Sequence, residues 1–164
     1  MASAKKAVPE GYHTITPQLT VDDAARAIDW YKKALGAEEL GRSNGPDGKV
    51  MHAELKIGGS RIFVNDPVMD NKGPKAYGGS PAALWLYVED CDALFTRAVT
   101  AGAQVRMPVD NQFWGDRMGA FVDPHGYSWS VATRKEDLTK EEMDRRAQEF
   151  FKAFAKNQPQ PAHT

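Results

Sequence analysis

The chain has 164 residues, of which 41% are hydrophobic and 26% are charged, and these values are typical of one soluble globular domain. Its formal net charge of −1 offers no global attraction for a nucleic acid or an anionic membrane, so we expect neither partner. The single cysteine, Cys91, excludes an intramolecular disulfide framework and a thiolate metal cluster and favours a reducing compartment, so we expect a cytoplasmic protein.

The N-terminal part of the chain predicts an arm, a strand and a helix. Residues 1–12 carry positive charge without a following apolar segment, and we expect them to form a flexible arm. Apolar and polar residues alternate over residues 14–21, which indicates a half-buried strand that Pro17 restricts to a sheet edge. Asp22 or Asp23 then caps a helix whose apolar positions recur at helical spacing as far as Gly36, a left-handed cap.

Three strands complete the first module. We expect them over residues 37–42, 49–57 and 60–65, separated by the turn formers of residues 44–48 and by Gly58-Gly59. Residues 13–66 therefore predict one βαβββ module. Residues 67–82 contain several glycines and prolines, and we expect a linker or mobile loop there.

The second half of the chain repeats this order. The patterns predict a strand over residues 84–88, a helix over residues 91–101, and three strands over residues 105–109, 116–122 and 127–133. Val21-Asp22-Asp23 matches Val88-Glu89-Asp90 at an offset of 67 residues (88 − 21), and Gly59 and Gly126 have the same offset (126 − 59). The offset predicts a second βαβββ module over residues 83–134.

Residues 135–164 are expected to form a C-terminal helix and a tail. Thr139-Lys140-Glu141-Glu142 supplies a capping box. A stripe of apolar side chains follows it, formed by Met143, Ala147, Phe150, Phe151 and Phe154. Such a stripe is most often a packing face, so we expect the helix to dock on its own domain or on a second subunit.

Several motifs occur along the chain in a fixed order. They are Thr16-Pro17-Gln18-Leu19-Thr20-Val21, Ala27-Ile28-Asp29-Trp30-Tyr31, Met51-His52-Ala53-Glu54-Leu55, Gly115-Asp116-Arg117 and Val122-Asp123-Pro124-His125-Gly126. Together they resemble the vicinal oxygen chelate superfamily of glyoxalase and bleomycin-resistance proteins, most closely its PhnB-like branch. The resemblance implies an α+β fold in which two tandem βαβββ modules form a cup-shaped mixed sheet around one site, and it implies a homodimer.

The resemblance also implies a metal site, which the residues of this chain do not fit. Enzymes of the superfamily hold a divalent metal with His, Glu or similar ligands on the first and last strands of each module. By alignment these positions hold Thr16, Phe63, Ala83 and Ser130. Alanine and phenylalanine supply no donor atom and a lone hydroxyl is a poor ligand for such a metal, so we expect no metal and no other cofactor.

The alternation of the strands predicts which side chains line the cup. One face of each strand covers a helix, so the other face is left for a ligand. In the first module this face is mainly polar, whereas the corresponding positions of the second module, which include Arg117, Gly119 and Phe121, are more aromatic. The residues expected to contact a small-molecule ligand are Gln18, His52, Glu54, Phe63, Trp85, Tyr87, Trp114, Arg117, Phe121 and Ser130, whereas we expect Trp30, Tyr31, Tyr127 and Trp129 in the core.

His52 and Glu54 lie two residues apart on one strand face and are the candidates for catalysis. They suit an acid/base pair or half of a displaced metal site, and the competing explanation is a structural ion pair or hydrogen bond with Arg61 or Arg117. Arg117 is the cation expected to hold an anionic part of a ligand, because its guanidinium can bind a carboxylate in two places. A structural pair between Arg117 and Glu54 explains that residue equally well.

These observations favour a metal-free protein that binds or sequesters a small, partly aromatic or polar organic molecule in the cup. The alternative is a lyase, isomerase or dioxygenase of the same superfamily, with a site rearranged around His52 and Glu54 and a divalent metal completed by substrate atoms. A protein-interaction module is a third possibility, which depends only on the tail helix and the loop of residues 67–82.

Overall fold

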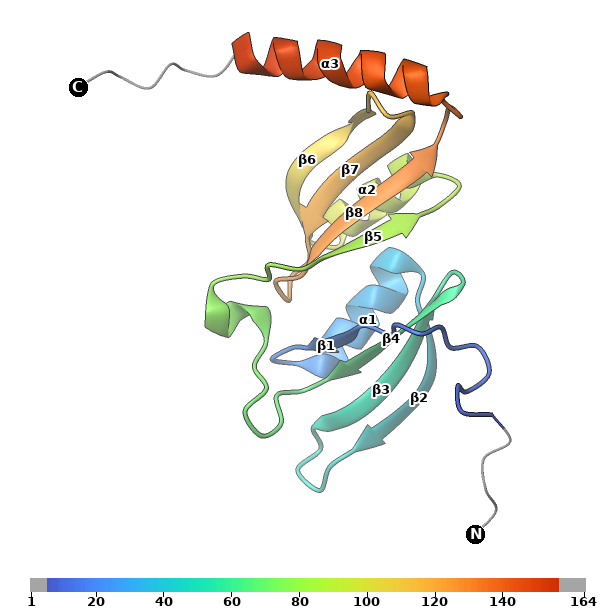
Figure 1. Cartoon of the computed structure of the whole chain (residues 1–164). Coiled ribbons are helices and arrows are strands. Elements are labelled where there is room, and N and C mark those ends of the chain that lie inside the picture. Colours follow the sequence, from blue (N-terminus) through green and yellow to red (C-terminus); the bar gives the residue numbers. More distant parts are fainter. Residues whose placement is uncertain (1–5, 157–164) are drawn as a thin grey trace, which may run out of the picture.

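Two modules of the same topology make up the fold, which the computed structural model describes over residues 6–156 (Figure 1). Residues 1–5 of the expected arm and 157–164 of the expected tail lie outside the described residues. The first module contains β1 (Gln18–Thr20), α1 (Ala24–Leu35), β2 (Glu38–Asn44), β3 (Val50–Ile57) and β4 (Ser60–Asn65). After the linker, which includes the short 3-10 helix η1 (Pro74–Tyr77), the second module contains β5 (Ala83–Tyr87), α2 (Cys91–Thr100), β6 (Gln104–Asn111), β7 (Asp116–Val122) and β8 (Ser128–Arg134), and α3 (Lys140–Lys156) follows it.

Each module forms one four-stranded mixed sheet. Sheet A has the order β1-β4-β3-β2 and sheet B the order β5-β8-β7-β6, and in both the first strand of the module runs parallel to its last. Helix α1 packs on one face of sheet A and α2 on one face of sheet B. We call the face of each sheet that its helix leaves uncovered the open face. The predicted α+β class, the two βαβββ modules and the C-terminal helix are confirmed.

Equivalent residues begin the two module helices. The side chain of Asp23 accepts a hydrogen bond from the backbone N–H of Arg26 at 3.1 Å, and that of Asp90 accepts one from Ala93 at 2.9 Å. The two capping residues keep the offset of 67 (90 − 23). Gly36 ends α1 with a φ of 69°, in the left-handed region that favours glycine. The local signals at the start and end of α1 were therefore sufficient to place it.

Strand β1 is shorter than the strand predicted over residues 14–21. Pro17 has no N–H to donate to a neighbouring strand, and the regular ladder begins only at Gln18. The carbonyl of Pro17 still accepts a hydrogen bond from the backbone N–H of Phe63 at 2.8 Å. Residues 14–17 thus approach β4 without forming a strand.

Contacts between the helices join the two modules. The indole N–H of Trp30 donates to the carbonyl of Ala101 at 2.8 Å, and Nε of Arg97 donates to the carbonyl of Ala34 at 2.8 Å. Because these bonds run from each module to the other, they fix the position of one sheet relative to the next.

Of the four aromatic residues predicted in the core, three are buried and one is not. Trp30, Tyr31 and Trp129 are buried, as predicted. Tyr127 is only half-buried, and its hydroxyl bonds to the backbone N–H and carbonyl of Thr20, both at 3.1 Å. Tyr127 therefore connects the second module to the first by hydrogen bonds, whereas the sequence predicted a core residue.

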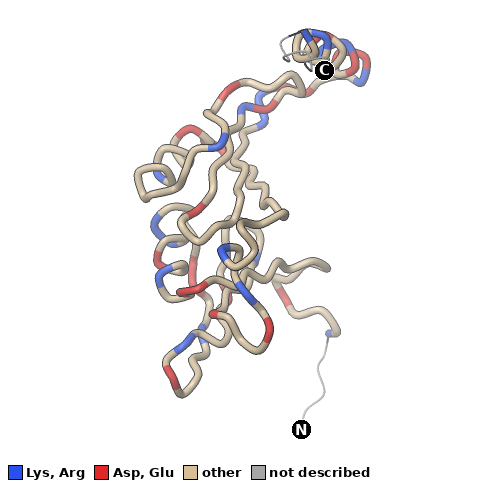
Figure 2. Tube along the Cα trace, turned by 90° about the vertical axis from the view of Figure 1, so that its left-hand side faces the viewer, with Lys and Arg blue, Asp and Glu red and all other residues tan. Residues whose placement is uncertain are grey.

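Helix α3 lies beyond sheet B, at the end of the molecule far from sheet A (Figures 1 and 2). Thr139 caps it as predicted, since the Thr139 hydroxyl accepts from the backbone N–H of Glu142 at 3.2 Å. Figure 2 shows basic and acidic residues interspersed along the chain, which agrees with the near-zero net charge. None of the helices within residues 6–156 combines the length and the apolar character needed to cross a membrane.

Candidate functional site

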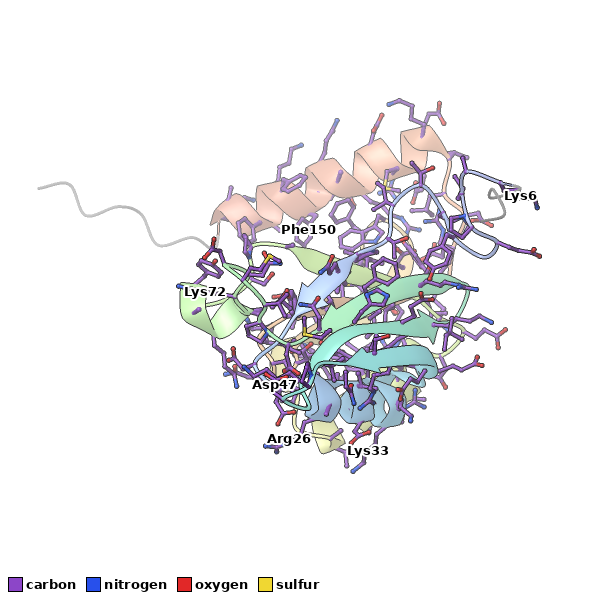
Figure 3. All side chains as sticks on the ribbon, turned by 90° about the horizontal axis from the view of Figure 1, so that it is seen from below. Lys6, Arg26, Lys33, Asp47, Lys72 and Phe150 are labelled. Carbon is purple, nitrogen blue, oxygen red and sulfur yellow. The ribbon has the colours of Figure 1, made fainter. Side chains whose placement is uncertain are left out.

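The open faces of the two sheets lie on the same side of the molecule, because α1 and α2 both lie on the other side (Figure 3). They meet where β5 passes the residues that precede β1. A cavity of about 230 Å³ at this junction is lined by both modules, with Thr16, Pro17 and Arg61 from the first and Leu84 and Trp85 from the second. The candidate site therefore spans both modules.

A row of three side chains crosses the open face of sheet A. Gln18 on β1 pairs with Phe63 on β4, and Phe63 pairs with Glu54 on β3. His52 lies next to this row, with its ring centroid 4.7 Å from that of Phe63. The structure thus brings these four candidates together on one face. Their contact with a ligand remains a prediction.

Glu54 is the centre of a charged cluster on this face. Its carboxylate lies 3.6 Å from Nε2 of His52 and 3.6 Å from Nη1 of Arg61, and it accepts a hydrogen bond from the hydroxyl of Tyr12. The hydrogen bond from Tyr12 is the main cause that lowers the pKa of Glu54, and it outweighs the opposing effect of burial. Glu54 is therefore an anion at neutral pH and a poor proton acceptor there.

Residues 7–16 pass over this cluster and wall in a pocket of about 650 Å³ together with Glu54, Arg61 and Phe63. The sequence analysis missed Tyr12, because it assigned residues 1–12 to a flexible arm. A signal was present in Pro9-Glu10-Gly11-Tyr12, which is a turn sequence with glycine at its third position.

The open face of sheet B is aromatic along the edge strand β5. Trp85 and Tyr87 are 46% and 62% exposed, and their ring centroids lie 6.1 Å apart. Ser130 on β8 pairs with Trp85 and lies on the same face. These three candidates thus lie on the open face as predicted, and their contact with a ligand stays a prediction.

Asp116, which is fully buried, holds two aromatic side chains at this edge. One of its carboxylate oxygens accepts from the hydroxyl of Tyr87 at 2.8 Å and from the indole N–H of Trp114 at 3.0 Å. The hydrogen bond to Asp116 is the main cause that raises the pKa of Tyr87. The sequence analysis chose the neighbouring Arg117 and overlooked Asp116, because strand alternation does not reveal which polar side chain is buried.

The predicted places of Arg117, Gly119 and Phe121 on the open face are wrong. Phe121 is fully buried on the helix side of sheet B, with its ring centroid 6.0 Å from that of Phe95 on α2. Arg117 forms two hydrogen bonds with the carboxylate of Asp92 near the start of α2, at 2.6 and 2.7 Å. Of the two partners proposed for Glu54, Arg61 is confirmed and Arg117 is excluded.

A one-residue difference between the two hairpins explains this error. Glu54 pairs with Phe63 in the first module, and Ala120 pairs with Ser130 in the second. Phe63 and Ser130 keep the offset of 67 (130 − 63), whereas Glu54 and Ala120 are 66 residues apart (120 − 54). Successive side chains of a strand point to opposite faces. The shift by one residue therefore turns Arg117, Gly119 and Phe121 toward the helix side of sheet B. The β7 residues on the open face are therefore Met118, Ala120 and Val122.

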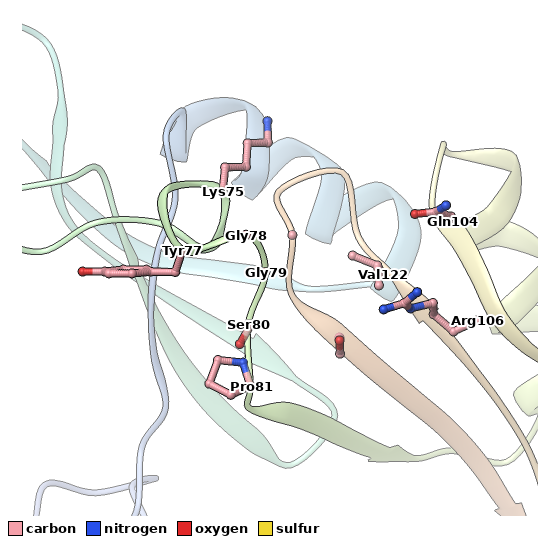
Figure 4. Close-up of a pocket in the computed structure, with 11 residues that line it drawn as sticks. Lys75, Tyr77, Gly78, Gly79, Ser80, Pro81, Gln104, Arg106 and Val122 are labelled. Carbon is pink, nitrogen blue, oxygen red and sulfur yellow. The ribbon is translucent and has the colours of Figure 1, made fainter. Parts of the chain in front are cut away.

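The open face of sheet B continues into a pocket of about 960 Å³ beside the linker (Figure 4). Arg106, Gln104 and Val122 lie on one side of this pocket, and the linker segment of residues 75–81 lies on the other. Arg106, which is exposed, and Lys75 are the cations that line this pocket, and Arg117 is not among its lining residues. Arg106 falls within the strand predicted over residues 105–109 and was not among the predicted site residues.

The donor atoms of the site do not fit a divalent metal ion. Phe63 and Ala83 have no donor atom, and Thr16 and Ser130 offer one hydroxyl each. Over residues 6–156, no group of three or more His, Cys, Asp or Glu side chains is arranged to hold a metal ion. His52 and Glu54 by themselves supply two donors, fewer than a tetrahedral or octahedral site requires of a protein.

Comparisons with known proteins give a consistent result. Residues 12–131 match the family model of the Glyoxalase/Bleomycin resistance protein/Dioxygenase superfamily. An uncharacterised protein of Mycobacterium bovis is 45% identical over 134 residues, which cover 79% of this chain and 88% of the relative. Helix α3 lies outside the matched range.

Two solved structures extend the comparison to the fold. TioX from Micromonospora sp. ML1 is 27% identical with a TM-score of 0.60, covering 77% of this chain and 100% of that one. A PhnB protein from Bacillus cereus, described as a putative 3-demethylubiquinone-9 3-methyltransferase, is 20% identical with a TM-score of 0.61, covering 74% of this chain and 99% of that one. At that identity the second likeness concerns the fold alone.

Proposed function

Because the chain belongs to the glyoxalase, bleomycin resistance protein and dioxygenase superfamily, we propose that it binds a small organic molecule on its two open faces without a metal ion. The observation that carries the proposal is the set of side chains at the four positions implied for metal ligands, Thr16, Phe63, Ala83 and Ser130. Since this set contains no imidazole and no carboxylate, binding must depend on aromatic surface and hydrogen bonds.

The open faces offer both kinds of contact. Trp85 and Tyr87 supply flat apolar surface on sheet B, where Asp116 fixes the ring of Tyr87. Sheet A supplies the charged cluster around Glu54. A molecule that is aromatic at one end and polar at the other suits this arrangement.

The alternative, a metal-dependent enzyme built on His52 and Glu54, has less support. The two side chains lie 3.6 Å apart, but Glu54 is also engaged by Tyr12 and Arg61. A metal-bound Glu54 would have to give up those contacts, and within residues 6–156 no third His, Cys, Asp or Glu side chain is placed to complete a metal site with the pair. We therefore assign the pair to ligand binding.

The test combines metal analysis with a ligand screen. Protein purified without chelator is expected to contain no stoichiometric transition metal. In a thermal-shift screen of small aromatic and polar molecules, the hits should raise the melting temperature equally with and without EDTA, and Trp85→Ala should weaken their binding by about tenfold or less because one stacking surface is lost. A tightly held transition metal, or hits that vanish on chelation, would overturn the proposal.

We also propose that two copies of the chain associate through the apolar face of α3. None of the residues of this helix is buried, and Phe150, Phe151 and Phe154 are 44%, 59% and 54% exposed. Phe150 lies on the side of α3 that faces the rest of the molecule (Figure 3), where its ring centroid is 5.0 Å from that of Phe113. An apolar patch of this kind is usually covered, and a net charge of −1 allows two copies to approach.

Removal of α3 should therefore change the oligomeric state. The full chain is expected to have the mass of a dimer by light scattering, whereas the chain ending at Leu138 should be a monomer with the same melting behaviour of its sheets. Phe150→Ala with Phe154→Ala should give the same result with α3 retained. Arg145→Ala, on the ion-paired face of α3, is the matched control and should remain dimeric. A dimer that survives truncation would place the interface elsewhere.

A further inference from the structure

The side chain of Tyr12 occupies the Glu54 cluster in the manner of a bound ligand. Its hydroxyl donates to the carboxylate of Glu54. The guanidinium carbon of Arg61 lies 4.4 Å from the centroid of its ring, and the ring of Phe63 lies 5.8 Å from it at an angle of 52°. A charge-assisted hydrogen bond, a cation–π contact and an aromatic contact thus meet on one phenol ring.

A turn formed by residues 9–12 places the side chain of Tyr12 on the Glu54 cluster. The backbone N–H of Tyr12 donates to the carbonyl of Pro9 at 3.2 Å, and Gly11 has a φ of 80°, in the region that favours glycine. A Cβ at Gly11 would also lie 2.5 Å from Nη2 of Arg61, so a larger residue at this position would push the guanidinium aside.

The segment between this turn and β1 is weakly attached. The side chains of His13, Thr14 and Ile15 are exposed, and Ile15 is 83% exposed although it is apolar. Tyr12 therefore provides much of the contact that holds the arm on sheet A. An element held by one side chain can be displaced by a molecule that makes the same contacts.

We propose that the Glu54 cluster is a binding site for an aromatic hydroxyl compound, and that Tyr12 occupies this site until such a compound displaces the arm. This inference rests on the proposed function and adds the class of the ligand and the segment with which it competes. The hydroxyl is needed because an ionised carboxylate only accepts hydrogen bonds. An anionic group in the same position would be repelled by Glu54, which is held in its charged form by Tyr12, His52 and Arg61.

The probe for the test is 4-methylphenol, which is the tyrosine side chain cut at its Cα–Cβ bond. Binding is followed by NMR, with the ring protons of His52 as reporters because that ring lies 4.7 Å from Phe63. Tyr12→Ala is expected to bind 4-methylphenol at least about tenfold more tightly than the unaltered protein, since the competing side chain is gone. Toluene, which lacks the hydroxyl, should bind Tyr12→Ala at least about tenfold more weakly than 4-methylphenol.

Two further variants separate this inference from a merely structural role of the arm. Glu54→Gln added to Tyr12→Ala should reduce the preference for 4-methylphenol over toluene, because a neutral amide oxygen replaces the charged acceptor. Lys6→Ala, an exposed change in the same arm that lies outside the lining of this pocket, should bind as the unaltered protein does. Equal affinity of Tyr12→Ala and the unaltered protein, or equal binding of toluene and 4-methylphenol, would overturn the inference. If other molecules still bound without metal in that case, the proposed function would stand and only the ligand class would be wrong.

Discussion

Replacing Asp123 with alanine should lower the free energy of unfolding by about 3–5 kcal/mol, the largest effect expected of a single substitution in this chain. Asp123 is 3% exposed, and its carboxylate accepts four hydrogen bonds. Two come from the backbone N–H groups of His125 and Tyr127, at 2.8 and 3.0 Å, and two from the side chains of Tyr31 and Trp129, at 3.0 and 2.8 Å. The alanine variant would leave these donors without a partner in the core.

The raised pKa of Tyr31 agrees with its assignment as a hydrogen-bond donor to Asp123. Burial, followed by the charge of Asp123, raises the pKa of Tyr31 well above its ordinary value, so the phenol keeps its proton and remains a donor. Tyr31→Phe removes one of the four donors together with its bond, and should cost about 1–2 kcal/mol.

Urea denaturation followed by tryptophan fluorescence measures both effects, since Trp30 and Trp129 are buried. Asp29→Ala, which removes an exposed carboxylate from α1, is the control and should change stability by less than about 0.5 kcal/mol. If Asp123→Ala behaved like Asp29→Ala, the hydrogen bonds of the carboxylate would not stabilise the fold.

Replacing Asp66 with alanine should be the second most damaging change, at about 2–4 kcal/mol. One carboxylate oxygen of Asp66 accepts from the backbone N–H of Ala24, at the start of α1, and the other from that of Val50, at the start of β3, at 2.9 and 2.7 Å. Because the side chain is buried, water could not replace it as the hydrogen-bond acceptor of either N–H group. Its negative charge also lies favourably at a helix N-terminus.

In the second module a neutral side chain accepts the hydrogen bond from the first backbone N–H of the helix, and this provides a matched comparison. Thr133 lies 67 residues after Asp66 (133 − 66), and its hydroxyl accepts from the backbone N–H of Cys91, at the start of α2, at 2.9 Å. The same hydroxyl donates to the carbonyl of Val88 at 2.9 Å. Thr133→Val should cost only about 1–2 kcal/mol, because both bonds that it removes are neutral. Thermal and urea denaturation of the two variants side by side tests the difference. An equal loss for both would show that the charge of Asp66 contributes nothing.

The order of the elements could be predicted from the sequence because both modules carry the same local signals. Asp23 and Asp90 cap helices, Gly36 ends one, and the alternation of Leu84, Leu86 and Val88 fixes the buried side of β5. Such signals act within a few residues, so they can be read from the chain. The length of β1 was overestimated because Pro17 interrupts the ladder without disturbing the alternation.

The candidate site was predicted less completely, for physical reasons that differ between residues. In β7 both faces are largely apolar, so alternation could not show whether Phe121 or Ala120 faces the helix. Only the pairing with β8 decides it, and pairing depends on turn length. Tyr12 was missed because its contacts with Glu54, Arg61 and Phe63 join parts of the chain that are distant in sequence.

The extra residue in the hairpin between β7 and β8 also bears on how the two halves came to differ. After a duplication, identical modules would have offered a ligand two identical surfaces. The gain or loss of one codon in a hairpin exchanges the inward and outward side chains of a whole strand, without a substitution within that strand. Such an exchange is tolerated only where both faces of the strand are apolar, because a charged side chain turned into the core lowers stability. Because β7 is largely apolar on both faces, it meets this condition, whereas β3, with His52, Glu54 and Lys56 on its open face, does not.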